Sequence, residues 1–276
     1  MQSNNPVLSR YEKTDKSGFA YDEGVSAYTQ AAAGGAGAAD LNTSFQQVTA
    51  GGGARLTIND VIVKTFAVFV ITVIFAVVGW NLADTMPWIL WVGMLGGLAL
   101  GLVNSFKRVP SPPLILLYGV FQGLMLGAIS NWYDAWAAGQ SYDGIVLQAV
   151  VATMTTFGVM LALYLTGIIK VTKKFQSIMI VALVSYLLLG LGNLIWALFG
   201  GGGGAGIYGT QFGIIVAVLG VLIAAFFLLL DFEAISQGIK MGAPERESWR
   251  MAFGLMVTLI WLYLEFLRLL AIFSRN

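Results

Sequence analysis

The stretch MAFGLMVTLIWLYLEFLRLLAIF, at residues 251–273, decides the fold class because it is long and apolar enough to cross a bilayer. A transmembrane helix needs about 20 consecutive apolar residues. This stretch also carries a carboxylate, Glu265, after fourteen residues without a charge. A second apolar run, IIVAVLGVLIAAFFLLL at 214–230, leads directly into Asp231. Because ionisable residues within membrane segments are costly and rare, these two acids are the first candidates for a functional site.

Stretches of this kind recur along the chain and predict seven membrane spans. They cover residues 61–83, 87–106, 112–131, 144–169, 177–199, 207–231 and 251–273. The prolines of KRVPSPP separate the second from the third, and the fourth is long enough to run past the bilayer at one end. The sequence therefore predicts an all-α polytopic membrane protein, with a seven-helix transmembrane domain at residues 56–276.

Composition supports this class and excludes others. The chain of 276 residues is 58% hydrophobic and 11% charged, with a formal net charge of +1. This balance gives no global attraction to nucleic acid. Cysteine and histidine are both absent, so thiol catalysis, a serine–histidine triad and histidine-ligated metal sites are excluded. We expect no enzyme activity and no cofactor.

Residues 1–55 are polar and of low complexity, and they include AAAGGAGAAD. Such a composition buries too little apolar surface to fold alone, so a disordered tail is predicted. A short amphipathic or docking element within it stays open. The segment lacks a long apolar run, which argues against a secretory signal peptide.

The distribution of lysine and arginine predicts the orientation. Basic residues gather in the tail and in the second, fourth and sixth connections between spans: Arg10, Lys13, Lys16, Arg55, Lys107, Arg108, Lys170, Lys173, Lys174, Lys240, Arg246 and Arg250. Because cytoplasmic loops are enriched in basic residues, the N-terminus is placed in the cytoplasm and, with seven spans, the C-terminus outside. A six-span topology, with one stretch re-entrant and the C-terminus inside, is the alternative.

Glycines recur at every fourth position in the second and third spans: Gly93, Gly97, Gly101, Gly119, Gly123 and Gly127. Small residues at this spacing let helix backbones approach closely. We expect the two spans to form a tight hairpin; a hinge or a pore lining is the functional alternative. Gln122 lies between two of these glycines, and we expect an interhelical hydrogen bond there in preference to a role in conduction.

Asp231 has two interpretations. Counted from residue 207 at 1.5 Å per residue, it lies about 36 Å along its helix, near the cytoplasmic edge of a core about 30 Å thick. With Glu233 it is then either an ordinary solvated helix end or part of a functional site. Lys107 and Arg108 end the second span at a similar depth. They are the best basic partners for Asp231, although the abundance of basic residues on the cytoplasmic side accounts for them equally well.

Glu265 lies deeper in its apolar stretch, and Arg268 follows three residues later on the same helix face. The pair is either a structural ion pair near the outer interface or a buried acid that titrates or binds a cation. Two acids sharing one proton would differ in pKa, and one of them would titrate near neutral pH.

Short motifs give the chain a family resemblance. LLLDFEAI at 228–235 and LYLEFLRLL at 262–270 resemble the paired signatures of the transmembrane Bax inhibitor motif family. MQSNNPVLSRYEK at the start, LTINDVIVKT at 56–65 and SFKRVPSPPLILLYGVFQG at 105–123 are similar to its bacterial branch. The resemblance implies a seven-helix fold with the last helix central in the bundle. It also implies a bacterial inner membrane and a pH-sensitive calcium leak.

The resemblance assigns roles to these residues. Asp231 matches the first acid of the family's pH sensor, Glu265 takes the place of the second, and Lys107 or Arg108 lies where the family has a basic latch. Three departures stand out: the second acid is glutamate, the GAPERESW loop is longer, and Gln122 replaces a residue that is often acidic. The longer loop puts direct contact between the two acids in question.

We therefore expect a cation leak, for Ca²⁺, gated by protonation of Asp231 and Glu265, which are also the candidate metal ligands because carboxylate oxygens suit Ca²⁺. The expected partners are the bilayer, Ca²⁺ and protons, without nucleic acid. A proton-coupled transporter for a small solute and a non-transporting regulator that binds a protease or stress protein are the alternatives.

Overall fold

The computed structural model describes residues 54–199 and 206–274. Nearly all of the predicted tail at 1–55, and most of the glycine-rich link at 200–206, lie outside these residues. The prediction of a disordered tail therefore stays a prediction.

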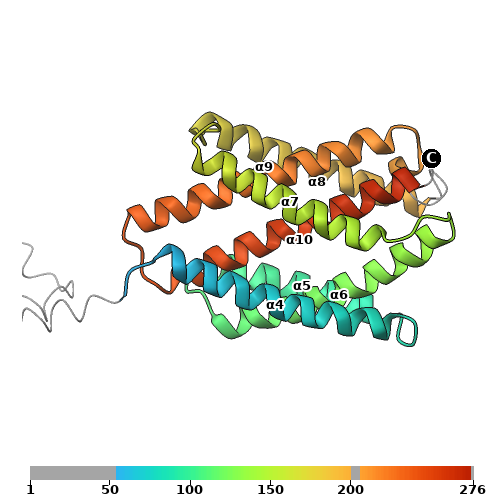
Figure 1. Ribbon diagram of the computed structural model, residues 1–276, viewed down its shortest axis with the longest axis horizontal. Coiled ribbons are helices and arrows are strands. Elements are labelled where there is room, and N and C mark those ends of the chain that lie inside the picture. Colours follow the sequence, from blue (N-terminus) through green and yellow to red (C-terminus); the bar gives the residue numbers. More distant parts are fainter. Residues whose placement is uncertain (1–53, 200–205, 275–276) are drawn as a thin grey trace, which may run out of the picture. The chain divides into compact units, whose positions relative to one another are not determined.

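Within the described residues, the regular structure is helical apart from one isolated bridge between Arg55 and Pro244. The helices are α4 (Ile58–Ala83), α5 (Ile89–Phe106), α6 (Pro112–Ala138), α7 (Ile145–Leu165), α8 (Lys173–Leu198), the short 3₁₀ helix η2 (Gly206–Gly209), α9 (Gly213–Lys240) and α10 (Glu247–Ser274). Seven of these are long and apolar enough to cross a membrane, judged by length and composition. The predicted all-α architecture with seven spans is confirmed (Figure 1).

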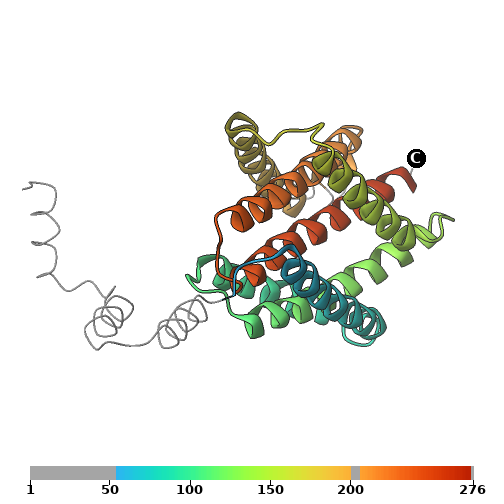
Figure 2. The same ribbon diagram turned by 60° about the vertical axis from the view of Figure 1, so that its left-hand side comes forward.

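The last helix, α10, is central in the bundle, as the resemblance implied. It packs against α4, α6, α7 and α9. Figures 1 and 2 show it passing between α4, α5 and α6 on one side and α7, α8 and α9 on the other. Leu262 and Met256 on this helix are fully buried against the equally buried Leu228 of α9. Side chains on α10 are therefore shielded over most of its length.

The expected hairpin of α5 and α6 is present, but the two runs of glycines face different helices. The glycines of α5 do face α6, where Gly93 leaves room for the backbone of Met125. Those of α6, however, face α4: a Cβ added at Gly127 would collide with the carbonyl oxygen of Ala76. The second run of glycines therefore joins α6 to α4, and α6 lies between its two neighbours.

Several helix ends differ from the predicted spans by two or more residues. α4 begins at residue 58, because the Thr57 side chain and Asp60 form a reciprocal capping box. α7 ends at residue 165 and does not run on to 169. α9 begins only at residue 213, because η2 and a turn take up the residues before it. Asp231 is therefore eighteen residues into α9, about 27 Å along the helix.

Candidate functional site

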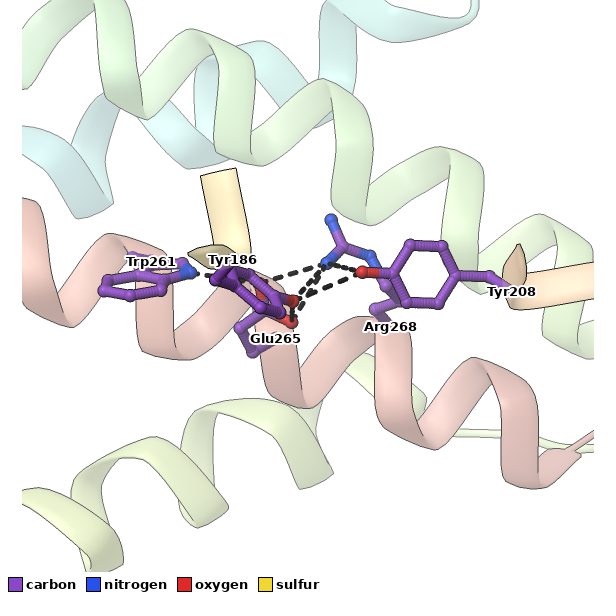
Figure 3. Close-up of polar contacts among 5 residues, drawn as sticks. All are labelled: Tyr186, Tyr208, Trp261, Glu265 and Arg268. Carbon is purple, nitrogen blue, oxygen red and sulfur yellow. Dashed lines mark hydrogen bonds and ion pairs between the residues drawn. The ribbon is translucent and has the colours of Figure 1, made fainter. Parts of the chain in front are cut away.

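Glu265 lies at the centre of a partly buried polar cluster, which we call the Glu265 cluster: Tyr186, Tyr208, Trp261, Glu265 and Arg268 (Figure 3). Glu265 is only 2% exposed. The Tyr186 hydroxyl donates to its Oε2 at 2.8 Å, and the Trp261 indole Nε1 donates to its Oε1 at 3.0 Å. A carboxylate removed from water is stabilised by such donors.

Arg268 supplies the charge that balances Glu265. Its Nη1 lies 3.0 Å from Oε1 and 2.9 Å from Oε2. The same nitrogen is 3.4 Å from the Tyr186 hydroxyl and 3.3 Å from that of Tyr208. The guanidinium carbon also lies 4.7 Å from the centre of the Tyr208 ring, in a cation–π contact. The predicted proximity of Glu265 and Arg268 on one helix face is therefore present as an ion pair.

Two features of the sequence position the side chains around Glu265: their spacing along α10 and a glycine in the neighbouring helix α9. Trp261 and Arg268 precede and follow Glu265 by four and three residues, which brings all three onto one face of α10. Gly220 of α9 makes room for the carboxylate: a Cβ there would lie 2.5 Å from Glu265 Oε2 and closer still to the hydroxyl oxygen of Tyr186.

Tyr208 comes from η2, outside the long helices. The Asn193 side chain on α8 accepts a hydrogen bond from the backbone N–H of Ile207 at 2.6 Å. Gly206, with φ 62°, brings the chain so close to Asn193 that a Cβ would not fit. This tie between α8 and η2 holds Tyr208 over the guanidinium.

Asp231 has a different environment. It faces the other half of α10, where its Oδ1 would lie 3.8 Å from a Cβ added at Gly254. Its Oδ2 is buried and has no hydrogen-bond partner within the part of the chain that the structure describes. Among the described residues no ion pair includes Asp231: the salt bridges are Lys64–Glu245, Arg250–Glu247 and Arg268–Glu265.

The two acids are far apart. Glu265 lies opposite Gly220, which is eleven residues before Asp231 on α9, and Asp231 lies opposite Gly254, eleven residues before Glu265 on α10. At 1.5 Å per residue, both counts give a separation of about 16 Å along the helices. Direct contact between the two acids, which the longer loop had put in question, is therefore absent in this arrangement, and they do not share a proton in it.

This geometry reflects an internal repeat that the sequence analysis overlooked. α9 and α10 are each 28 residues long, with the glycine at the eighth position and the acid at the nineteenth. Both contain glycine, ten residues without a charge, an acid and phenylalanine: GVLIAAFFLLLDF and GLMVTLIWLYLEF. The helices follow each other through a short connection, and each acid faces the glycine of the other. The glycine-to-acid spacing was the signal in the sequence.

Lys107 and Arg108 are exposed, and neither forms an ion pair within the described part of the chain. Their backbone carbonyls accept hydrogen bonds from Arg250 Nη2, at 3.3 Å and 2.5 Å respectively. Arg250 lies one turn before Gly254 on α10. The backbone of the connection between α5 and α6 is thus hydrogen-bonded to the part of α10 that faces Asp231.

The two secondary candidates lie at separate places. Glu233 accepts hydrogen bonds from the Tyr164 hydroxyl at 2.9 Å and from Gln237 Nε2 at 2.8 Å. Gln122 lies between α5 and α6, against Gly97. Its Oε1 is buried, and no described residue forms a hydrogen bond with it.

Neither acid belongs to a cluster of metal ligands within residues 54–199 and 206–274. Asp231 and Glu265 each present one carboxylate.

Comparison with known proteins gives the chain its family. No curated protein matches it. A family model described as Bax inhibitor 1 like matches residues 5–275, which include every described helix. The chain therefore belongs to the Bax inhibitor 1-like family.

Proposed function

We propose that this protein is a pH-sensitive cation leak channel for Ca²⁺, acting as a conduit and not as an enzyme, and that Asp231 is the group whose protonation gates it. Membership of the Bax inhibitor 1-like family and seven candidate spans support a role in the membrane. The observation that carries the proposal is the buried Asp231 Oδ2, for which residues 54–199 and 206–274 supply no hydrogen-bond partner. A carboxylate oxygen left free in this way is available to a proton or to a passing cation.

Protonation of Asp231 changes the charge that a cation meets. When the side chain is ionised it attracts a cation, and when it is protonated the attraction is lost. We therefore expect the leak to fall as the pH is lowered. Lys107 and Arg108 are our candidates for the latch, because the connection that carries them is bound by Arg250, one turn from the glycine opposite Asp231.

The membrane and orientation are part of the proposal. The alternation of basic and non-basic connections supports a cytoplasmic N-terminus and an outer C-terminus. The resemblance to bacterial sequences supports the inner membrane. In this orientation Asp231 lies in the cytoplasmic half of α9, and the Glu265 cluster lies in the outer half of the bundle.

The test is Ca²⁺ flux into proteoliposomes across a pH series. Wild type is compared with Asp231→Asn and Glu265→Gln, and Glu233→Gln serves as the matched control because it removes an acid two residues away. We expect Asp231→Asn to abolish the pH dependence, whereas Glu233→Gln keeps it. A flux that ignores both pH and the substitution at Asp231 would refute the proposal.

One observation favours a second candidate, a proton-coupled transporter of a small solute. Such transporters are often built from inverted repeats with coupling acids near the repeat interface. The antiparallel repeat of glycine and acid in α9 and α10 has this form. Proton flux that requires an added solute, measured in the same proteoliposomes, would favour the transporter over the leak.

A further inference from the structure

The Glu265 cluster surrounds one nitrogen atom with oxygen. Arg268 Nη1 lies 2.9–3.4 Å from four oxygens: both carboxylate oxygens of Glu265 and the hydroxyls of Tyr186 and Tyr208. The oxygens come from three separate elements, α8, η2 and α10. Oxygens that converge in this way are the donor set that hard metal cations prefer.

The surroundings favour a cation at this point. Glu265 supplies a full negative charge, and its side chain is only 3% exposed. The face of the Tyr208 ring, 4.7 Å from the guanidinium carbon, adds the attraction of an aromatic ring for positive charge. The absence of a side chain at Gly220 leaves space for the carboxylate. These features bind positive charge whether it is carried by arginine or by a metal ion.

Arg268 can leave the site more easily than Glu265. The Arg268 side chain is 31% exposed, ten times as much as that of its partner. Its long aliphatic stem lets the charged head move while the backbone stays in place. The carboxylate, by contrast, is fixed by Trp261 and Tyr186. When the guanidinium moves out, the oxygens of Glu265 remain where they are.

We propose that the Glu265 cluster is a second cation site and that Arg268 is a tethered cation that occupies it. A metal cation, Ca²⁺ in the proposed leak, enters only when it displaces the guanidinium. The metal draws the oxygens inward, from the present 2.9–3.4 Å to about 2.3–2.6 Å. This inference rests on the proposed function: cations pass Asp231 and the Glu265 cluster in series, about 16 Å apart by the helical count. Arg268 then limits the rate of the leak.

The experiment compares wild type with Arg268→Gln, Arg268→Lys and the double variant Glu265→Gln/Arg268→Gln. Ca²⁺ binding to purified protein is followed by calorimetry and by tryptophan fluorescence, because the indole of Trp261 contacts the site. Ca²⁺ flux is measured in proteoliposomes. Lys240→Gln is the control, because it removes an exposed basic residue at the end of α9. All variants are first compared by gel filtration in detergent to establish that they are folded.

We expect Arg268→Gln to bind one more Ca²⁺ per chain than wild type and to leak at least about tenfold faster, the factor that corresponds to one charge-assisted hydrogen bond. Arg268→Lys restores part of the block because it keeps the positive charge. The double variant loses the added binding. Lys240→Gln behaves as wild type.

Two results would overturn the inference. One is that Arg268→Gln binds no additional Ca²⁺. The other is that the added binding persists without Glu265. If Arg268→Gln does not fold, Tyr208→Phe removes one of the four oxygens with little change in shape. A faster leak in this variant supports the tethered-cation role, and an unchanged leak contradicts it.

The two proposals fail in distinguishable ways. If no protein leaks, but Arg268→Gln binds Ca²⁺ through Glu265, the leak is refuted and the cation site stands. If the leak depends on Asp231 while Arg268→Gln alters neither binding nor flux, the leak stands and the tethered cation is refuted.

Discussion

Replacing Gly220 by alanine tests how tightly α9 fits the Glu265 cluster. The new Cβ would lie 2.5 Å from Glu265 Oε2, whereas ordinary contacts begin near 3.4 Å, so the carboxylate must move by almost 1 Å. The hydrogen bond from Tyr186 to this oxygen is now 2.8 Å and would be lost. A hydrogen bond to a charged group contributes about 1.5–3 kcal/mol. Alanine regains about 1 kcal/mol because it is the better helix former.

The expected net loss of stability is thus about 0.5–2 kcal/mol, and the melting temperature should fall by about 1–8 °C at this chain length. Thermal unfolding in detergent, followed by tryptophan fluorescence, measures the change. Gly158→Ala on α7 is the matched control, because nothing lies within 4 Å of a Cβ there and only the helix preference changes. A Gly220→Ala protein that melts at or above the temperature of the Gly158→Ala protein would refute the close fit.

Three further outcomes are expected from the same unfolding assay. Thr57→Ala removes the capping box of α4 and should cost about 1 kcal/mol; no loss would mean that the cap is not used in the membrane. Gly127→Ala should be more destabilising than Gly220→Ala, because its Cβ meets the Ala76 backbone and not the end of a side chain; the reverse order would contradict the packing of α6 on α4. Glu265→Gln leaves Arg268 without a counter-charge and should cost about 3–5 kcal/mol, whereas the double variant with Arg268→Gln should recover part of this loss. Equal losses of stability in Glu265→Gln and in the double variant would show that the Glu265 and Arg268 side chains are not energetically coupled.

The seven spans could be predicted from the sequence because each is a continuous apolar stretch, and lipid leaves a chain few ways to satisfy its backbone there. The ends were harder to predict. Hydropathy does not mark the start of α9 sharply, since apolar residues such as Ile207 and Phe212 already lie before its first residue. The sequence also could not predict which helix the glycines of α6 face. A stripe of small residues predicts a close neighbouring helix but does not identify it.

In the candidate site, the contacts within α10 could be predicted from the sequence, whereas those made by distant parts of the chain could not. Glu265 and Arg268 were paired by their spacing on one helix, and Trp261 could have been added by the same rule. Tyr186 and Tyr208 lie some 60 to 80 residues before Glu265 in the chain. Nothing local distinguishes them from the tyrosines of an ordinary membrane interface. Their role follows only from the packing of α8 and η2 against α10.

The repeat explains why two similarly placed acids differ in their surroundings. In α10, the residue four before the acid is Trp261 and the residue three after it is Arg268; in α9 the same positions hold Phe227 and Ala234. A donor and a counter-charge are thus present for Glu265, while phenylalanine and alanine supply neither for Asp231. The two helices place their acids alike. Because these two positions differ, the Glu265 carboxylate has a donor and a counter-charge, while Asp231 has a buried oxygen that no described residue hydrogen-bonds. The Glu265 carboxylate is therefore held by Trp261 and Arg268 of its own helix, whereas the matching positions of α9 give Asp231 no such support.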